Sequence, residues 1–368
     1  HRVKKDDTGD RQGFDVTTWG GSLQLESDTA MGEWIYGAEY YRDGVDSYAS
    51  KYNADGSLKS VEIQGPVADD ASYHSLGVYV EDTVRLLNDQ LDVVPGVRYT
   101  FSKADADRVK DPVSGDPMSV SGDWDAFVGS LRLLHPLSDD RKHVVFAGVS
   151  QGFRAPNLSD LTRLDSARST EIETPVSDLD PETYIAYEVG LKSRFETLVS
   201  QATYYTTTID KMMVRAPTGR TAEELDEVTK KNSGQGYVQG VELSETVTIT
   251  REWSTWLAAS WMDGKVDAYP TSDTVMERDY ISRLMPPTMQ LGLRWQREDR
   301  KYWAELVGNA AARADKLSAD DERDTQRIPP GGTPSYAVWH VRIGSNVTKD
   351  LGVSLAMENV FNEDYRIH

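Results

Sequence analysis

The sequence of 368 residues contains no cysteine and no long apolar run. The absence of cysteine excludes disulfide frameworks, zinc ribbons and thiol nucleophiles, and it suits a protein that crosses an oxidising periplasm. The longest apolar runs fall far short of the roughly 20 residues that a membrane-spanning helix needs. A membrane protein of another kind stays open, because the strands of a β-barrel alternate lipid-facing residues with polar ones.

Basic residues are also scarce, since 40 lysines and arginines face 60 aspartates and glutamates, which gives a formal net charge of −20. We expect no nucleic-acid partner, because phosphate backbones are bound by stripes of lysine and arginine. The six histidines are scattered, with no pair at the i, i+2 or i, i+4 spacing of a metal site: His1, His74, His135, His143, His340 and His368. We therefore predict no enzyme, no catalytic residue, no metal and no cofactor.

The residues that are abundant favour strands. The chain has 18 Tyr, 9 Trp and 7 Phe, which suit pleated, half-buried surfaces, and 28 Gly, which suit turns. In 290–296, Leu291, Leu293 and Trp295 fall on one face and Arg294 falls on the other, which is the period of a strand. The same alternation recurs in 184–192, 337–344 and 351–358. These patterns predict an all-β protein.

Fourteen candidate strands can be counted in this way. They lie near 14–26, 33–44, 73–87, 90–102, 122–136, 142–152, 182–195, 199–215, 235–249, 253–264, 285–297, 301–312, 335–347 and 351–361. Most reach the roughly 9–11 residues that a tilted strand needs to cross a bilayer, whereas strands of globular proteins average about 5–6.

The connections between these strands alternate strictly between short and long. The short ones lie near 27–32, 88–89, 137–141, 196–198, 250–252, 298–300 and 348–350, and the long ones near 45–72, 103–121, 153–181, 216–234, 265–284 and 313–334. A soluble meander has no reason to sort its loops in this way, whereas a transmembrane β-barrel has short turns on the periplasmic side and long loops outside. The pattern predicts an antiparallel transmembrane β-barrel.

Several motifs resemble signatures of TonB-dependent outer-membrane receptors. From Val149 the chain reads VSQGFRAPNLSDL, and from Leu179 it reads LDPETYIAYEVGLK. The resemblance continues through GVYVEDTVRLLNDQLDVVPGVRYT from Gly77, NSGQGYVQGVEL from Asn232 and SLAMENVFNEDY from Ser354. It covers nearly the whole chain, with the motifs in the order and spacing of the family.

The resemblance implies a barrel of about 22 strands that holds an N-terminal plug domain. Fourteen strands are present here, so we expect residues 1–368 to be a single, partial barrel domain that lacks the plug, the first strands and the last strand. The implied location is the outer membrane of a Gram-negative-type bacterium. The implied partners are outer-membrane lipid and lipopolysaccharide, the plug, a TonB-type energy-coupling protein that acts through the plug, and a small-molecule solute.

The long loop that follows GFRAP supplies the candidate ligand-binding residues: Arg154, Asn157, Arg163, Asp165, Arg168, Glu171 and Glu173. Two interpretations of Arg154 stay open, since a residue where a strand meets a loop can hold the structure together or contact a ligand. Between residues 157 and 180, six carboxylates face two arginines, a net charge of −4. This charge is typical of a solvated loop, which we favour, or of a loop that attracts a cationic or metal-bearing ligand.

Seven charged residues are expected to face the lumen, where the family holds its plug: Glu81, Arg98, Glu188, Lys192, Glu242, Arg294 and Arg342. The apolar residues of the same strands are expected to face lipid: Ile185, Val189, Leu291, Leu293, Trp295, Val353 and Leu355.

Three functions remain possible. The first is active import of a siderophore-bound iron, cobalamin, saccharide or similar solute with energy from the inner membrane. The second is a passive porin or hydrophobic-solute channel, because 14 is an even number of strands that could close by themselves. The third is a soluble all-β binding protein. A regular ladder between the strands near 14–26 and 351–361 would favour the second function. The span 157–178 lacks the histidine that haem receptors of the family use, which puts haem uptake by that route in doubt.

Overall fold

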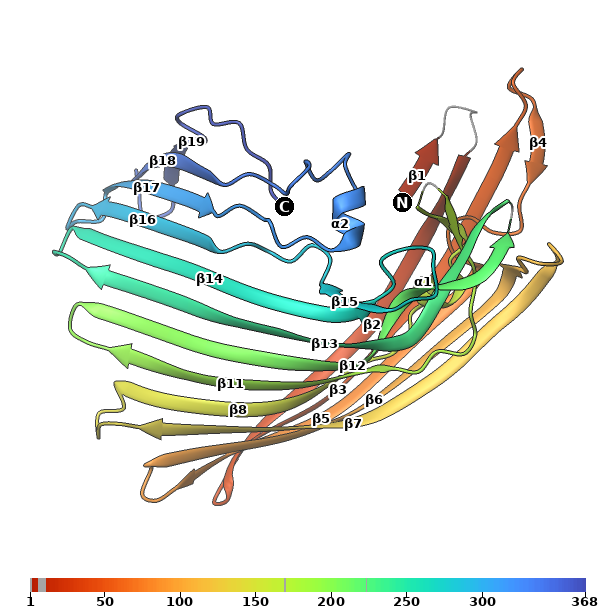
Figure 1. The fold of residues 1–368 in the computed structure, drawn as a ribbon. Helices are drawn as coiled ribbons and strands as arrows, with labels where there is room; N and C mark the ends of the chain where they lie inside the picture. The colour runs from red at the N-terminus through yellow and green to blue at the C-terminus, as the bar shows by residue number, and fades with distance from the viewer. Residues whose placement is uncertain (1, 6–10, 169, 223) are drawn as a thin grey trace.

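The computed structural model describes residues 2–5, 11–168, 170–222 and 224–368. They form one large, curved antiparallel sheet with two short helices (Figure 1). The strands of the described residues are β1 (Arg2–Lys5), β2 (Arg11–Thr29), β3 (Gly32–Tyr52), β4 (Leu58–Val61), β5 (Asp69–Leu86), β6 (Leu91–Lys110), β7 (Pro117–Pro136), β8 (His143–Arg154), β9 (Asp165–Arg168), β10 (Glu171–Glu173), β11 (Glu182–Arg194), β12 (Leu198–Ala222), β13 (Leu225–Thr248), β14 (Trp253–Ala268), β15 (Glu277–Tyr280), β16 (Thr288–Gln296), β17 (Tyr302–Ala311), β18 (Tyr336–Asn346) and β19 (Gly352–Met357). The helices are α1 (Leu158–Thr162) and α2 (Ala319–Arg323). Neither helix is long and apolar enough to cross a membrane.

All fourteen predicted strands are present, and each pairs antiparallel with its neighbours in chain order. They are β2, β3, β5, β6, β7, β8, β11, β12, β13, β14, β16, β17, β18 and β19. This order places the short turns at one end of the sheet and the long loops at the other, as Figure 1 shows. The all-β, antiparallel prediction is confirmed.

Several strand boundaries were predicted wrongly at the loop end. The span 216–234 was expected to be a loop, but β12 and β13 continue through it as a hairpin. The ladder passes irregularities near Ile209 and Met212 and then resumes between Met213 and Asn232. This span lies between two segments of regular alternation, which predicts a loop, whereas the backbone hydrogen bonds of the two adjacent strands extend the hairpin beyond the apolar pattern.

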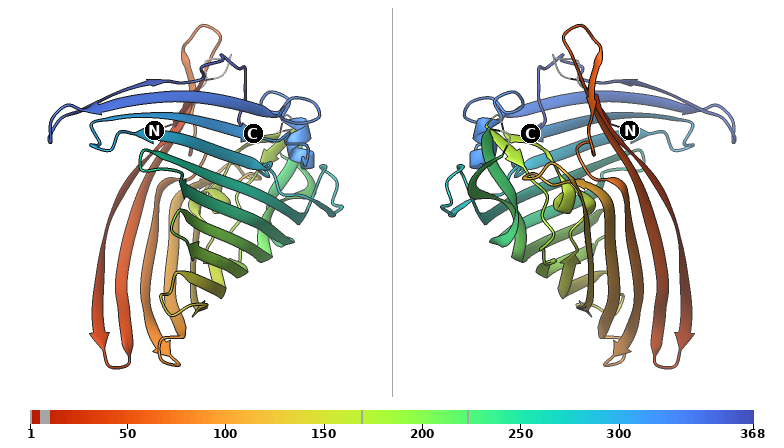
Figure 2. Two further views of the ribbon diagram at one scale, coloured as in Figure 1. Left: turned by 90° about the vertical axis from the view of Figure 1, so that its left-hand side faces the viewer. Right: turned by 90° about the vertical axis from the view of Figure 1, so that its right-hand side faces the viewer.

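The sheet is open at its two margins. Within the described residues, β2 pairs with β1 and β3, and β19 pairs with β18 alone, so no ladder joins β2 to β19. Figure 2 shows the N-terminal and C-terminal strands as the separate margins of a curved sheet. These fourteen strands therefore do not close into a barrel by themselves.

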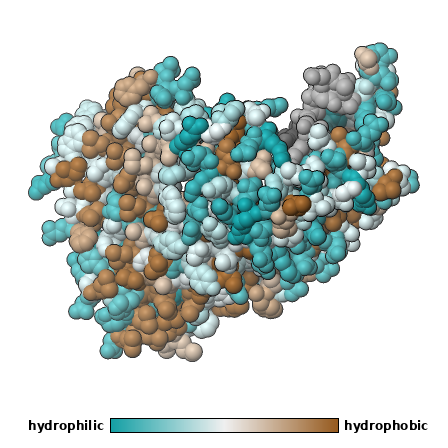
Figure 3. Space-filling model, viewed as in Figure 1, coloured by the Kyte–Doolittle hydropathy of each residue, from teal (hydrophilic) through white to brown (hydrophobic). Residues whose placement is uncertain are grey.

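The pairing register separates two faces. Arg294 pairs with Glu305, which pairs with Arg342, whereas the neighbouring Leu293 pairs with Leu306 on the opposite face. Traced from strand to strand, the register places all seven predicted lumen residues on one face and all seven predicted lipid-facing residues on the other. In Figure 3 hydrophobic residues gather over the strands nearer the short turns, and hydrophilic ones gather toward the long loops.

The main buried cluster lies at the loop end, on the face that carries the predicted lumen residues. Leu158 and Leu161 of α1 belong to it, together with Ala104 of β6 and Met213 of β12. Leu161 is only 1% exposed. The helix α1 thus lies within the curve of the sheet (Figure 2) and anchors the loop after β8 against the inner face.

Candidate functional site

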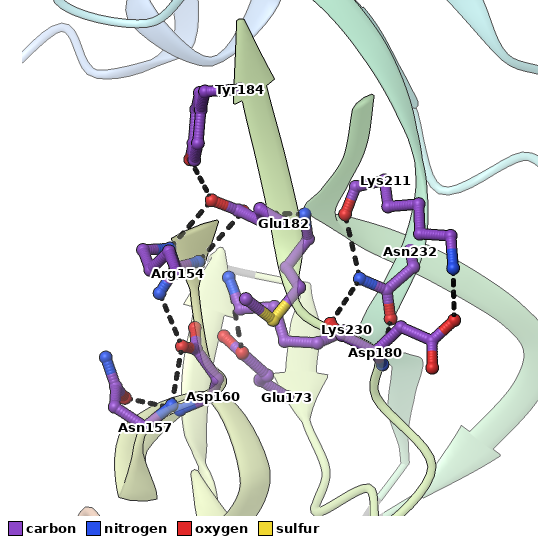
Figure 4. A network of polar contacts seen from close by, with 11 residues as sticks. Arg154, Asn157, Asp160, Glu173, Asp180, Glu182, Tyr184, Lys211, Lys230 and Asn232 are labelled. Carbon is purple, nitrogen blue, oxygen red and sulfur yellow. Dashed lines mark hydrogen bonds and ion pairs between the residues drawn. The ribbon is translucent and has the colours of Figure 1, made fainter. Parts of the chain in front are cut away.

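Arg154 and Glu182 join the two ends of the long connection between β8 and β11. Arg154 donates from Nε to Glu182 Oε2 at 2.7 Å and from Nη2 to Glu182 Oε1 at 2.9 Å (Figure 4). These two residues are also partners in the β8–β11 ladder. A bidentate arginine–carboxylate pair fixes orientation as well as distance. The two ends of the connection are therefore held together.

Further contacts converge on the same carboxylate. Glu182 is 3% exposed and also accepts the Tyr184 hydroxyl and, at 2.8 Å, the Met213 backbone N–H. Arg154 uses its remaining branch to bind Asp160 of α1 at 2.8 Å. A single arginine thereby joins β8, β11 and α1, which gives it a structural role.

Asn157 begins the helix α1. Its side chain accepts the Asp160 N–H at 2.9 Å, while the Asp160 carboxylate accepts the Asn157 N–H at 3.1 Å. This is a reciprocal capping box, in which side chains satisfy amide groups that a helix start leaves unbonded. The Asn157 side chain is therefore engaged in holding α1, although it also lines the cavity described below.

The acidic residues of this connection are fastened to the β12–β13 hairpin. Glu171 is fully buried and accepts from Arg215 at 2.9 Å and from the Ser272 hydroxyl at 2.7 Å. Glu173, 4% exposed, forms ion pairs with Arg163 at 3.5 Å and Lys230 at 3.6 Å. The interpretation of a solvated acidic loop is therefore wrong for Glu171 and Glu173. Arg163 belongs to the local charge count, but Arg215 and Lys230 lie on β12 and β13 and are absent from it.

Backbone pairing and a further ion pair add to this fastening. The strand β10 pairs in parallel with β13, with Glu171 opposite Asp226. Asp180 binds Lys211 at 2.9 Å, and its backbone exchanges hydrogen bonds with the Asn232 side chain (Figure 4). The connection and the hairpin therefore pack together as one body at the loop end of the sheet.

A cavity of about 880 Å³ lies beside this body, on the inner face of β2, β3 and β5. Four of the seven predicted ligand-binding residues line it, namely Arg154, Asn157, Arg163 and Asp165. Glu171 and Glu173 are not among its lining residues, and the side chain of Arg168 lies outside the described part of the chain.

The sequence did not point to the other walls of the cavity. Lining residues that were not predicted include Phe14, Val16, Asp43, Tyr73 and Arg327. They come from β2, β3, β5 and the loop after α2, so only the curvature of the sheet brings them together. The alternation in β2 could have shown that Phe14 and Val16 share a face, but not what lies opposite them.

The predicted lumen residues form local charge and aromatic contacts across strands. Glu188 binds Arg132 at 3.1 Å, and Arg98 binds Glu39. The Arg294 guanidinium lies 4.5 Å from the centre of the Trp303 ring, a cation–π contact. Contact of this wall with a plug stays a prediction. Among the described residues, no group of three or more histidine or carboxylate side chains is arranged to hold a metal ion.

Comparisons with known proteins agree with this geometry. The family model described as TonB dependent receptor-like, beta-barrel matches residues 3–360. The pesticin receptor of Yersinia enterocolitica is 23% identical over 295 residues, which covers 77% of this chain and 38% of the receptor. The vitamin B12 transporter BtuB of Photobacterium profundum is 22% identical over 351 residues, which covers 95% of this chain and 46% of the transporter.

Solved structures show the same fold. The copper transporter OprC superposes with a TM-score of 0.76 at 17% identity, covering 98% of this chain and 52% of that protein. The ferric yersiniabactin uptake receptor FyuA of Yersinia pestis superposes with a TM-score of 0.65 at 16% identity, covering 99% of this chain and 52% of that protein. The chain thus spans less than half the length of these two curated relatives and about half of these two structures.

Proposed function

Since the chain belongs to the TonB-dependent receptor family, of which it matches the β-barrel part, we propose that it forms the barrel wall of an active importer. The importer lies in the outer membrane of a Gram-negative-type bacterium. It takes up a scarce small solute with energy delivered from the inner membrane through a plug and a TonB-type coupling protein. The family consists of receptors and transporters, and the proposed activity is transport without catalysis.

The match over residues 3–360 carries this proposal, and the architecture supports it. The cavity of about 880 Å³ lies at the loop end of the inner face, where a solute arriving from outside would first meet the barrel. Its size falls in the range of roughly 300–1,000 Å³ that is usual for small-molecule sites. The alternative of a passive 14-stranded channel is not supported, because no ladder joins β2 to β19 in the described residues.

The identity of the solute does not follow from similarity. The names of the relatives and of the superposed structures refer to pesticin, vitamin B12, copper and ferric yersiniabactin. We propose a solute of the same broad group, namely a siderophore complex, cobalamin, a metal, a saccharide or a similar nutrient. Of the four predicted ligand-binding residues that line the cavity, Arg154 and Asn157 are engaged in structural hydrogen bonds, so we propose that Arg163 and Asp165 are the ones that contact the solute.

The proposal is tested by uptake in the native bacterium. We expect deletion of the gene to abolish accumulation of one nutrient from a panel of radiolabelled iron complexes, copper and cobalamin. The same accumulation should be lost when the coupling protein is deleted or the proton gradient is collapsed, because import is driven from the inner membrane. Accumulation that depends on the gene but persists without the gradient would replace this proposal with passive diffusion.

A further inference from the structure

Two arginines from loops far apart in the chain line the same cavity. Arg163 follows α1, in the connection between β8 and β11, and Arg327 follows α2, in the connection between β17 and β18. The Arg163 side chain is 38% exposed and that of Arg327 is 74% exposed. Both side chains are therefore accessible to solvent, and both residues belong to the wall of one cavity.

Each of these arginines shares its carboxylate with a second cation. Glu173 binds Arg163 at 3.5 Å and Lys230 at 3.6 Å. Asp324 binds Arg327 at 3.5 Å, but it binds Arg283 more closely, at 2.5 Å. Both distances to the cavity arginines exceed those of a direct hydrogen bond, so their N–H donors are not committed to these carboxylates. Arg154, in contrast, is fixed by a bidentate pair and a second carboxylate.

The remaining lining restricts the kind of anion that fits. Asp43 lines the same cavity, and in a chain of net charge −20 its carboxylate opposes binding of a small inorganic anion. Phe14, Val16 and Tyr73 supply an apolar and aromatic wall on β2 and β5. A ligand must therefore gain affinity from an apolar body as well as from its charge.

We propose that Arg163 and Arg327 form a clamp for the acidic group of an organic solute whose aromatic or apolar body lies against Phe14, Val16 and Tyr73. The solute class is thus an amphiphilic organic acid, free or as part of a metal chelate. This inference rests on the proposed import function for its biological meaning. Its test is a binding measurement that requires no uptake.

The experiment uses the complete natural protein purified in detergent micelles and two probes that share one ring system. Equilibrium dialysis measures the dissociation constants of 2-naphthoate, which is anionic, and 2-naphthamide, which is neutral. We expect Arg163→Gln and Arg327→Gln each to weaken naphthoate binding about tenfold, which is the usual loss for one charge-assisted hydrogen bond. Binding of naphthamide should change less than twofold, and Arg163→Lys and Arg327→Lys should restore part of the affinity for naphthoate.

Arg220→Gln is the matched control, because Arg220 is an exposed arginine paired with Glu227 and does not line the cavity. A heat-shift gel verifies that every variant is folded. The inference is overturned if the cavity variants weaken binding of both probes equally or of neither probe. It is also overturned if neither probe binds the unaltered protein, or if Arg220→Gln weakens naphthoate binding as much as the cavity variants do. If the clamp fails its test but uptake still depends on the gradient, the import function stands and the clamp is rejected. If the clamp passes its test but uptake is passive, the clamp stands and the import function is rejected.

Discussion

Glu182 is the residue on which most contacts of the candidate site converge. It accepts hydrogen bonds from the Arg154 guanidinium, the Tyr184 hydroxyl and the Met213 amide while almost fully buried. Removing the charge from such a group leaves its partners without an acceptor of equal strength. The consequence is large because the same residue holds both ends of a long connection.

We expect Glu182→Gln to lower the free energy of unfolding by about 2–3 kcal/mol, less than for a fully buried pair because Arg154 is partly exposed. Urea unfolding of the complete receptor in micelles, followed by tryptophan fluorescence, measures this change. Glu188→Gln is the control, since Glu188 and Arg132 form a more exposed pair on the same strand system. The control should cost less than about 1 kcal/mol. Equal costs would show that the Arg154–Glu182 ion pair contributes no more to stability than an exposed pair does.

Asp321 plays a similar part at α2. Burial disfavours its charge, but hydrogen bonds from Ser282, Ser318 and the Arg283 backbone outweigh burial and hold its pKa below the usual value of 3.8. A carboxylate with a lowered folded pKa stabilises the fold fully above its unfolded pKa, and this stabilisation is lost as the pH falls through the folded pKa.

We therefore expect the α2 loop to loosen below about pH 4. Hydrogen–deuterium exchange of peptides from 313–334, corrected for the intrinsic effect of pH, measures the loosening. Asp321→Asn should raise exchange in this loop already at pH 7 and remove the additional acid response. An acid response of unchanged size in the variant would assign the loosening to another group.

Sequence patterns could locate some of these residues and, for Arg154, also its partner. Arg154 was predicted at the junction of a strand and a loop, which is where it lies. Its pairing with Glu182 could have been inferred, because the last residue of one strand and the first of the next antiparallel strand are neighbours. Arg327 and Asp43 could not have been placed in the cavity, since their proximity depends on the curvature of the whole sheet.

At the scale of elements, the alternation of side chains determines which face of each strand would meet lipid in the proposed barrel. In β16, Leu293 lies on the face opposite Arg294 and is 37% exposed in this open sheet. Gln290 lies on the same face as Arg294 and pairs with Asn309. The two positions are three residues apart on one strand, so they differ mainly in the face that they occupy.

We expect Leu293→Arg to disfavour folding by about 2–4 kcal/mol, the cost of an arginine facing lipid near the membrane midplane. Gln290→Arg should cost less than about 1 kcal/mol, because its side chain meets the polar interior. Refolding of the complete receptor into lipid vesicles, assayed by protection from trypsin, compares the two variants. Equal losses would contradict the assignment of faces.

The existence of the strands was more predictable than their ends. Period-two alternation and loop parity found all fourteen, because both are expected of the strands of a transmembrane β-barrel. The loop ends of β12 and β13 were missed, since 216–234 shows no regular alternation of apolar and polar residues. The short β10 was missed as well, because its parallel pairing with β13 joins segments more than fifty residues apart.

At the scale of the whole molecule, the open margins are the dominant feature. In the described residues, the part of β2 that does not pair with β1 has no partner strand on its outer edge, and β19 has none on the other margin of the sheet. Unpaired backbone groups cost several kcal/mol each in hydrocarbon, and in water they pair with other chains. The exposed Leu23 and Leu25 of β2 lie at this margin.

We expect residues 1–368, produced alone and refolded in detergent, to form oligomers and to give no steady pore. Light scattering after gel filtration measures the former, and conductance across a planar bilayer measures the latter. Leu23→Lys should reduce oligomer formation, because an edge lysine opposes strand pairing. A monomer with a constant single-channel conductance would show that the fourteen strands close, and the passive-channel function would then return.

The ion pairs between the β8–β11 connection and the β12–β13 hairpin set a rule for building chimeric receptors. Glu171 forms an ion pair with Arg215, and Glu173 forms one with Lys230, both on the neighbouring hairpin. A graft of the connection alone would bring buried carboxylates into a host that lacks these cations, and the loss would appear as poor assembly. The smallest transplantable unit therefore runs from the end of β8 to the end of β13, and families of this kind should exchange the two segments together.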